Sequence, residues 1–165
     1  MFHIFVVDDN PNTRRLTSAI LRQNGYDPIE ATDGADALKK METNHVDLIL
    51  LDIKMTSEED YIRYTGGSLA HTMAFLKKAE TRGIPVWIRQ VIVPAINDSE
   101  ENIDRLASLL SPFSCVERVE LLPFRTLCVE KYRSLGIPFP LEGTPDMTKE
   151  QIAPLQERIN KALEK

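Results

Sequence analysis

Three aspartates in the first third of the chain have the spacing of an acidic site. Asp8 and Asp9 directly follow the apolar run 4–7, and Asp52 ends the apolar run 47–52. If these runs are neighbouring strands of a parallel sheet, their carboxyl ends lie at one edge and the carboxylates converge there. Mg²⁺ prefers such oxygen ligands, and a carboxylate beside it can accept a phosphoryl group. The alternative interpretation is that Asp8 and Asp9 only lead into a loop and cap the next helix.

Cationic side chains fall near the ends of the later strand-like runs. They predict a basic flank that could hold an anion or a nucleotide-like ligand, whereas the alternative is that they are solvated charges or partners of nearby carboxylates. The two cysteines, Cys115 and Cys128, are too few and too far apart to predict a metal cluster. The cationic residues in question are Lys54, Arg89, Arg125 and Arg133.

Apolar runs that alternate with amphipathic segments predict strands joined by helices. Residues 56–67 are predicted to be a polar connection, and Leu16, Ala19 and Ile20 to be the inner face of the first helix. Strands are expected at residues 4–7, 28–31, 47–52, 85–93 and 116–122, and helices at about 10–25, 33–41, 68–82, 99–110, 128–135 and 148–163.

This alternation predicts an α/β fold with a five-stranded parallel sheet. We expect the flavodoxin-like order 2-1-3-4-5 with helices on both faces, because the short proline-led run 28–31 suits an edge strand. The alternative is a partial (β/α) barrel with the order 1-2-3-4-5 and helices only on the outside. In either architecture the functional face lies at the carboxyl ends of the strands.

Composition excludes several classes of protein. A chain of 165 residues favours one domain, and its net charge of −5 argues against a nucleic-acid or anionic-membrane partner. No apolar run approaches the roughly 20 residues that span a bilayer. Met1 leads directly into a strand-like run without a basic region or a cleavage site, so we expect no signal peptide and a cytoplasmic protein.

The first part of the chain resembles the N-terminal half of a bacterial response-regulator receiver domain. The resemblance covers residues 3–55 and is carried by Ile4-Phe-Val-Val-Asp-Asp9, by Ala31-Thr-Asp-Gly-Ala-Asp-Ala-Leu38 and by Asp47-Leu-Ile-Leu-Leu-Asp52. It implies that Asp8 and Asp9 are the acidic pair of the family, that Asp9 ligates Mg²⁺ together with the Lys54 carbonyl, and that Asp52 is the phosphoacceptor.

The later part of the receiver pattern is missing. Gln90 stands near the place of the family's hydroxyl residue, and Leu122 stands where its lysine precedes a Pro-Phe pair. The usual phosphorylation switch is therefore not expected.

From Leu51 to about Leu163 the chain instead resembles the C-terminal part of the pyruvate formate-lyase-activating enzymes, which are radical S-adenosylmethionine enzymes. The carriers are Leu51-Asp-Ile-Lys54, Val86-Trp-Ile-Arg-Gln-Val-Ile-Val-Pro94, Asn97-Asp98, Glu120-Leu-Leu-Pro-Phe124 and Lys131-Tyr132.

The second resemblance implies a cofactor site. Asp52, Lys54 and Arg89 would border S-adenosylmethionine, and Arg125 stands where the family usually has a histidine. The family's Cys-x-x-x-Cys-x-x-Cys loop is absent from this sequence. An iron-sulfur cluster needs thiolate ligands, so we expect none.

Together the resemblances predict a chimera, with a single hybrid domain over residues 1–165 made of a receiver-like half, 1–55, and an activase-like fragment, 56–165. We expect a designed or recombined scaffold that is not an enzyme; a natural fusion is the alternative origin. The functional alternatives are a Mg²⁺-dependent phosphoacceptor at Asp52 and a binding module for a nucleotide-like or anionic ligand. Self-association through the hybrid interface is the expected interaction.

Overall fold

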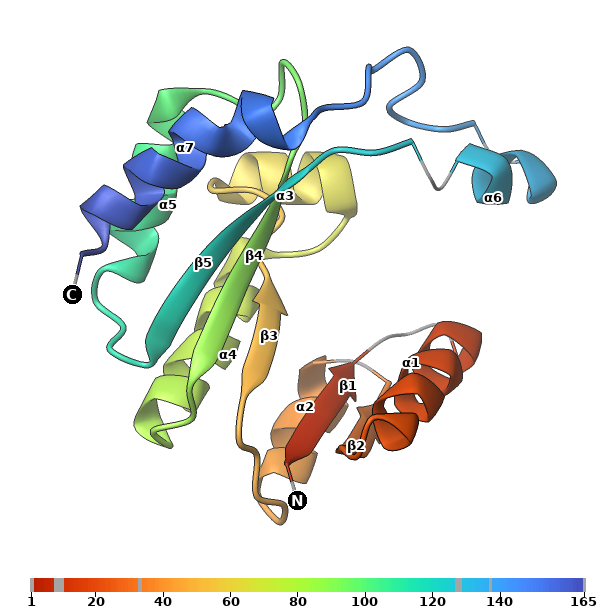
Figure 1. Ribbon diagram of the computed structural model, residues 1–165, viewed down its shortest axis with the longest axis vertical. Coiled ribbons are helices and arrows are strands. Elements are labelled where there is room, and N and C mark those ends of the chain that lie inside the picture. The colour runs from red at the N-terminus through yellow and green to blue at the C-terminus, as the bar shows by residue number, and fades with distance from the viewer. Residues whose placement is uncertain (1, 8–10, 33, 127–128, 137, 165) are drawn as a thin grey trace. The chain divides into compact units, whose positions relative to one another are not determined.

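Parallel strands are joined by one or two helices each, which confirms the α/β class (Figure 1). The structure, a computed structural model, describes residues 2–7, 11–32, 34–126, 129–136 and 138–164. No helix in these ranges is long and apolar enough to cross a bilayer. The elements are β1 (His3–Val7), α1 (Pro11–Gln23), β2 (Asp27–Ala31), α2 (Gly34–Met41), β3 (Ile49–Asp52), α3 (Glu58–Thr65), α4 (Leu69–Thr81), β4 (Val86–Ile92), α5 (Glu100–Leu110), β5 (Val116–Pro123), α6 (Val129–Ser134) and α7 (Lys149–Ala162).

The strands are paired in the predicted order, but they form two sheets. β1 and β2 make a parallel pair, and β3, β4 and β5 make a three-stranded sheet. A single parallel bridge between Ile4 and Leu48 is consistent with the order 2-1-3-4-5. The structure thus has two sheets where one continuous five-stranded sheet was predicted, and the fold class is the predicted one. The His3 backbone N–H donates to the Asp47 carboxylate at 2.7 Å, so this donor is not available to extend the ladder.

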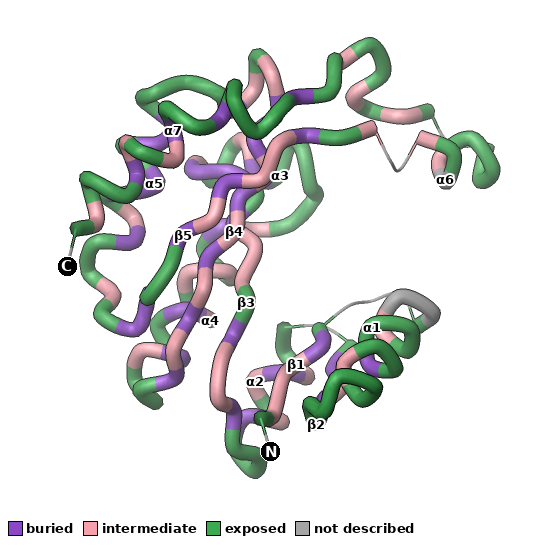
Figure 2. Tube along the Cα trace, viewed as in Figure 1, coloured by how far each residue is buried: buried purple, intermediate pink, exposed green. Residues whose placement is uncertain are grey.

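The central strand β4 has one sealed face and one accessible face. Its residues alternate between buried and half-buried along its length (Figure 2). Gln90 lies on the sealed face with the aliphatic residues, and Arg89 lies on the other. This alternation follows from the period of two in a strand, and it keeps a charged side chain within reach of solvent.

The chain forms two compact units from interleaved segments. The first contains Met1–Leu51, Ala70–Ile88 and Phe113–Arg118, and the second contains Asp52–Leu69, Arg89–Pro112 and Val119–Lys165. Both have fully buried aliphatic side chains, such as Leu76 in the first and Ile103 in the second. The prediction of a single domain with halves 1–55 and 56–165 stays a prediction.

Helix α3 occupies part of the segment that was predicted to be a polar connection. Ser57 caps its start, because its side chain accepts a hydrogen bond from the Asp60 backbone N–H at 3.1 Å. Three acidic residues in the first turn stabilise the helix by interacting with the positive end of its dipole. Gly66 ends the helix with φ 67°. The prediction failed because it relied on apolar periodicity, and of this helix only Tyr61 is buried.

Helix α1 also presents a different face from the one predicted. Leu16, Ala19 and Ile20 are exposed, and Leu16 and Ile20 are 64% and 51% accessible. Ser18 is buried instead, and Arg14, one turn earlier, pairs with Glu30 of β2 at 3.4 Å. The ion pair and the small buried serine therefore define the packed face of this helix.

In the first unit, a carboxylate on α4 holds the start of β5. Ser114 Oγ donates to one oxygen of Glu80 at 2.6 Å, and the Cys115 backbone N–H donates to the other at 2.7 Å. The hydrogen bonds from Ser114 and then Cys115 lower the pKa of Glu80 from 4.5 to about 2. Because the folded-state pKa is depressed, the stabilisation is complete above pH 4.5 and is lost as the pH falls toward about 2.

We expect Glu80→Gln to lower the Tm at neutral pH, because the neutral amide cannot replace the ionised acceptor. The difference in Tm between this variant and the wild type should shrink as the pH falls from 4.5 toward 2. Thermal unfolding followed by circular dichroism over that range checks the expectation. Glu157→Gln, which removes an exposed carboxylate paired with Lys161, is the matched control. A difference that does not change with pH would contradict the role of the Glu80 charge.

Candidate functional site

Asp52 lies at the carboxyl end of β3 with a cation on each carboxylate oxygen. Lys54 Nζ is 2.8 Å from Oδ2, and Arg89 Nε is 2.9 Å from Oδ1. Arg89 lies on the neighbouring strand β4. The two strands are aligned just beyond the end of β3 by a backbone hydrogen bond in which Ile53 N–H donates to the Arg89 carbonyl at 2.9 Å. The sheet therefore brings together three of the residues that the sequence predicts to be functional. We call Asp52, Lys54 and Arg89 the Asp52 cluster.

The Asp52 cluster is ionised and reachable from solvent. Burial acts to raise the pKa of Asp52, but the Lys54 ammonium and the Arg89 guanidinium outweigh it and hold the pKa below its ordinary value of 3.8. The three side chains are between about one third and one half exposed. With one carboxylate and two cations, the cluster carries an excess positive charge that favours an anionic ligand.

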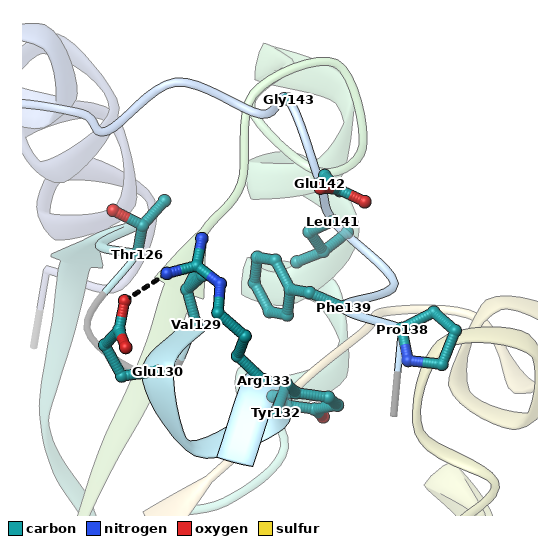
Figure 3. A pocket seen from close by; sticks show the side chains of 10 residues that line it. All are labelled: Thr126, Val129, Glu130, Tyr132, Arg133, Pro138, Phe139, Leu141, Glu142 and Gly143. Atoms are coloured by element: carbon teal, nitrogen blue, oxygen red, sulfur yellow. Dashed lines mark hydrogen bonds and ion pairs between the residues drawn. The ribbon is translucent and has the colours of Figure 1, made fainter. Parts of the chain in front are cut away.

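The other predicted cations lie elsewhere. Arg125 faces Asp146 at 3.6 Å, and Arg133 pairs with Glu130 on α6. Figure 3 shows Arg133 in a cavity of about 570 Å³, beside an edge-to-face pair of Tyr132 and Phe139. The side chains that line this cavity are half-buried or exposed, and the charge of Arg133 is already balanced. The predicted basic flank is thus reduced to Lys54 and Arg89.

The predicted Mg²⁺ site is only partly visible. Asp8 and Asp9 lie outside the described residues, so their approach to Asp52 stays a prediction. In the described part of the chain, no group of three His, Cys, Asp or Glu residues could hold a metal ion. Both Asp52 oxygens are in ion pairs, and the Lys54 carbonyl accepts a 3.4 Å hydrogen bond from Asn97. The described residues by themselves therefore do not fit Mg²⁺.

Gln90 belongs to a buried polar network that the sequence did not reveal. Asn102 Nδ2 donates to Gln90 Oε1 at 3.0 Å, and Thr56 Oγ1 donates to Asn102 Oδ1 at 2.8 Å. Arg105 Nε reaches Thr56 Oγ1 at 3.3 Å. The network joins the segment after Lys54 to β4 and α5, so Gln90 has a structural partner where a receiver would present a hydroxyl.

An iron-sulfur cluster does not fit the residues of this chain. Cys115 is buried, and its backbone N–H binds Glu80 at the start of β5. Cys128 lies outside the described residues. Two cysteines in the whole sequence cannot supply the three thiolates of the activase motif.

Comparison with known protein families supports the first resemblance. Residues 4–63 match the response regulator receiver domain. The matched segment includes Asp52 and Lys54 and extends eight residues beyond the boundary at residue 55 that the sequence suggested.

Curated relatives support the second resemblance. The pyruvate formate-lyase-activating enzyme of Clostridium pasteurianum is 42% identical over 120 residues, which are 73% of this chain and 50% of that protein. The enzyme of Staphylococcus epidermidis is 37% identical over 116 residues, which are 70% of this chain and 46% of that protein. The chain spans about half the length of the curated relatives it matches.

The two matches overlap. Any stretch of 120 residues in a chain of 165 must include positions 46–120, so the match to the C. pasteurianum enzyme contains the whole Asp52 cluster. The receiver match ends at residue 63, so both matches include at least residues 46–63. The chain thus matches one family in its N-terminal part and the other over most of its length, and both matches include β3.

These relatives correct one expectation. The prediction that the chain is not an enzyme was wrong, because proteins 35–42% identical to it are named as pyruvate formate-lyase-activating enzymes. A solved structure shows the same fold: a domain of pyruvate-formate lyase-activating enzyme from Bacteroides vulgatus. It has a TM-score of 0.65 at 14% identity and covers 96% of this chain and 92% of that one.

We expect Lys54→Met to raise the pKa of Asp52 toward its ordinary value, because one of the two cations that stabilise the carboxylate is lost. The stabilisation that Asp52 contributes should then disappear at a higher pH as acid is added. NMR titration of the side-chain carboxyl carbon checks this pKa. Lys161→Met removes a lysine of an exposed ion pair with Glu157 and should leave the titration unchanged. An unaltered Asp52 titration in Lys54→Met would rule out the ion pair in solution.

Proposed function

Because Asp52 lies within the receiver match, we propose that it is a receiver-like phosphoacceptor. The observation that carries the proposal is the pair of cations on its carboxylate, at 2.8 and 2.9 Å. Receiver chemistry needs an ionised carboxylate at the end of a strand and positive charge beside the incoming phosphoryl group. Asp52, Lys54 and Arg89 meet both needs.

The transfer uses the carboxylate as the nucleophile. An oxygen of Asp52 attacks the phosphorus of a small acyl phosphate, the bond from phosphorus to the donor oxygen breaks, and its electron pair leaves with the donor carboxylate. The product is an acyl phosphate on Asp52. Lys54 and Arg89 then offset the charge on the transferred oxygens, as preorganised cations do in phosphoryl transfer.

Arg89 and Lys54 take the place of the lysine that a receiver carries after its fifth strand. The corresponding residue here, Leu122, is apolar and half-buried. Arg89 contacts Asp52 through Nε, so its terminal amino groups can turn toward phosphoryl oxygens without breaking that contact. The proposal concerns acceptance of phosphate and not the conformational output of a receiver.

Incubation with acetyl phosphate and Mg²⁺ should give a phosphate adduct that intact-protein mass spectrometry detects. The adduct should vanish in Asp52→Asn and persist in Asp146→Asn, which changes an aspartate paired with Arg125. Arg89→Gln should slow its formation at least roughly tenfold, since about 1.4 kcal/mol of lost transition-state stabilisation gives that factor. A parallel incubation without Mg²⁺ tests the predicted metal requirement. Absence of an adduct in the wild type would refute the proposal.

The second candidate is a nucleotide-like ligand at the same cluster. Its support is the 42% identical stretch, which contains Asp52, Lys54 and Arg89, the residues that the activase resemblance places beside S-adenosylmethionine. The partly exposed cations Lys54 and Arg89 suit the carboxylate of S-adenosylmethionine, and Asp52 suits its ammonium. This candidate concerns binding, because the chain spans half the length of its relatives.

Isothermal titration with S-adenosylmethionine tests the second candidate. We expect measurable heats for the wild type and a loss of at least roughly tenfold in affinity for Arg89→Gln, because one charged contact is removed. Arg158→Gln, which disrupts an exposed clamp to Asp104 and Glu100, is the control and should bind like the wild type. Flat heats for the wild type would remove this candidate and leave the phosphoacceptor proposal untouched.

A further inference from the structure

The turn between β4 and α5 has an unusual backbone. Ala95 has φ 61°, in the left-handed region that residues with a side chain rarely adopt. The Asp98 side chain holds this turn, because its Oδ1 accepts a hydrogen bond from the Ala95 backbone N–H at 3.0 Å. Such conformations persist only where surrounding contacts impose them, and they concentrate at functional sites.

The contacts around this turn centre on one buried amide. Asn97 is 2% exposed, and its Oδ1 accepts the Val93 backbone N–H at 2.6 Å. Its Nδ2 donates to the Val91 carbonyl at 3.0 Å and to the Lys54 carbonyl at 3.4 Å. One side chain therefore links the end of β4 to the residue that carries a cation of the Asp52 cluster.

The position of Lys54 depends on the Asn97 hydrogen bonds more than the position of Arg89 does. Arg89 lies within β4, where its carbonyl takes part in the ladder with Ile53. Lys54 lies two residues beyond the end of β3, where the strand ladder no longer holds the backbone. The Lys54 carbonyl instead accepts a hydrogen bond from Asn97, and the Lys54 ammonium donates one to the Asp52 carboxylate.

We propose that Asn97 is a positioning residue that sets where Lys54 meets Asp52. The strained turn at Ala95 places the amide so that it reaches both β4 and the chain after β3. Without the amide, the Lys54 carbonyl loses the hydrogen bond that Asn97 Nδ2 donates, and the Lys54 ammonium spends less time on the Asp52 carboxylate. The consequence for phosphoryl transfer rests on the proposed function of Asp52, whereas the positioning itself does not.

Chemical labelling of Lys54 tests the positioning directly. A water-soluble acetylating reagent reacts with the neutral lysine amine, which a side chain held on a carboxylate offers less often than a free one. Peptide mass spectrometry gives the rate at each lysine. We expect Asn97→Ala to raise the labelling rate at Lys54 several-fold while Lys161 is unchanged. Gln156→Ala is the matched control, because Gln156 also bridges two backbone groups, Leu121 N–H and the Val119 carbonyl, and should leave Lys54 as in the wild type.

The variant can be examined in a stabilised background if it unfolds on its own. Ala95→Gly removes the side chain at the positive φ and should raise the Tm, so Ala95→Gly/Asn97→Ala is compared with Ala95→Gly. Wild-type labelling of Lys54 in a folded Asn97→Ala variant would overturn the proposal. Faster labelling together with no phosphate adduct on the wild type would support the positioning role and refute the phosphoacceptor. Faster labelling with slower adduct formation would support both.

Discussion

The backbone register between β3 and β4 is the constraint on which the site depends. The hydrogen bond from Ile53 N–H to the Arg89 carbonyl sets Asp52 beside Arg89. A slip of one residue would turn Arg89 onto the sealed face and Gln90 toward Asp52, because side chains alternate along a strand. The buried aliphatic residues on either side of Gln90 oppose that slip, since it would move them to the accessible face.

The two faces of β4 divide the polar residues by function. On the sealed face, Gln90 is held by Asn102, which lowers the cost of burying its amide. On the accessible face, Arg89 keeps partial contact with solvent, so its pairing with Asp52 avoids the full desolvation cost of a buried ion pair. The chain can therefore keep this charged cluster partly exposed without burying unpaired charge.

Local signals in the sequence predicted much of the fold. Apolar runs located the strands, and the helix expected at about 148–163 is α7, which begins with a capping box of Thr148 and Gln151. Helix α3 was not predicted, because its caps are strong but its apolar pattern is weak. The prediction of the buried face of α1 was wrong because it relied on the helical spacing of Leu16 and Ile20. The packed face depends instead on the ion pair of Arg14 with Glu30 of β2, which spacing within the helix does not reveal.

The sequence by itself determined the class of the fold, the resemblance to two families and the choice of Asp52 as its central acidic residue. These depend on composition, caps and motifs, which are written in short stretches of the chain. The tertiary structure decided which cations meet Asp52. Four were candidates, and Lys54 and Arg89 reach it while Arg125 and Arg133 pair with other carboxylates. The physical reason is that an ion pair needs contact within a few ångströms, and strand register, not spacing along the chain, sets which distant residues come that close.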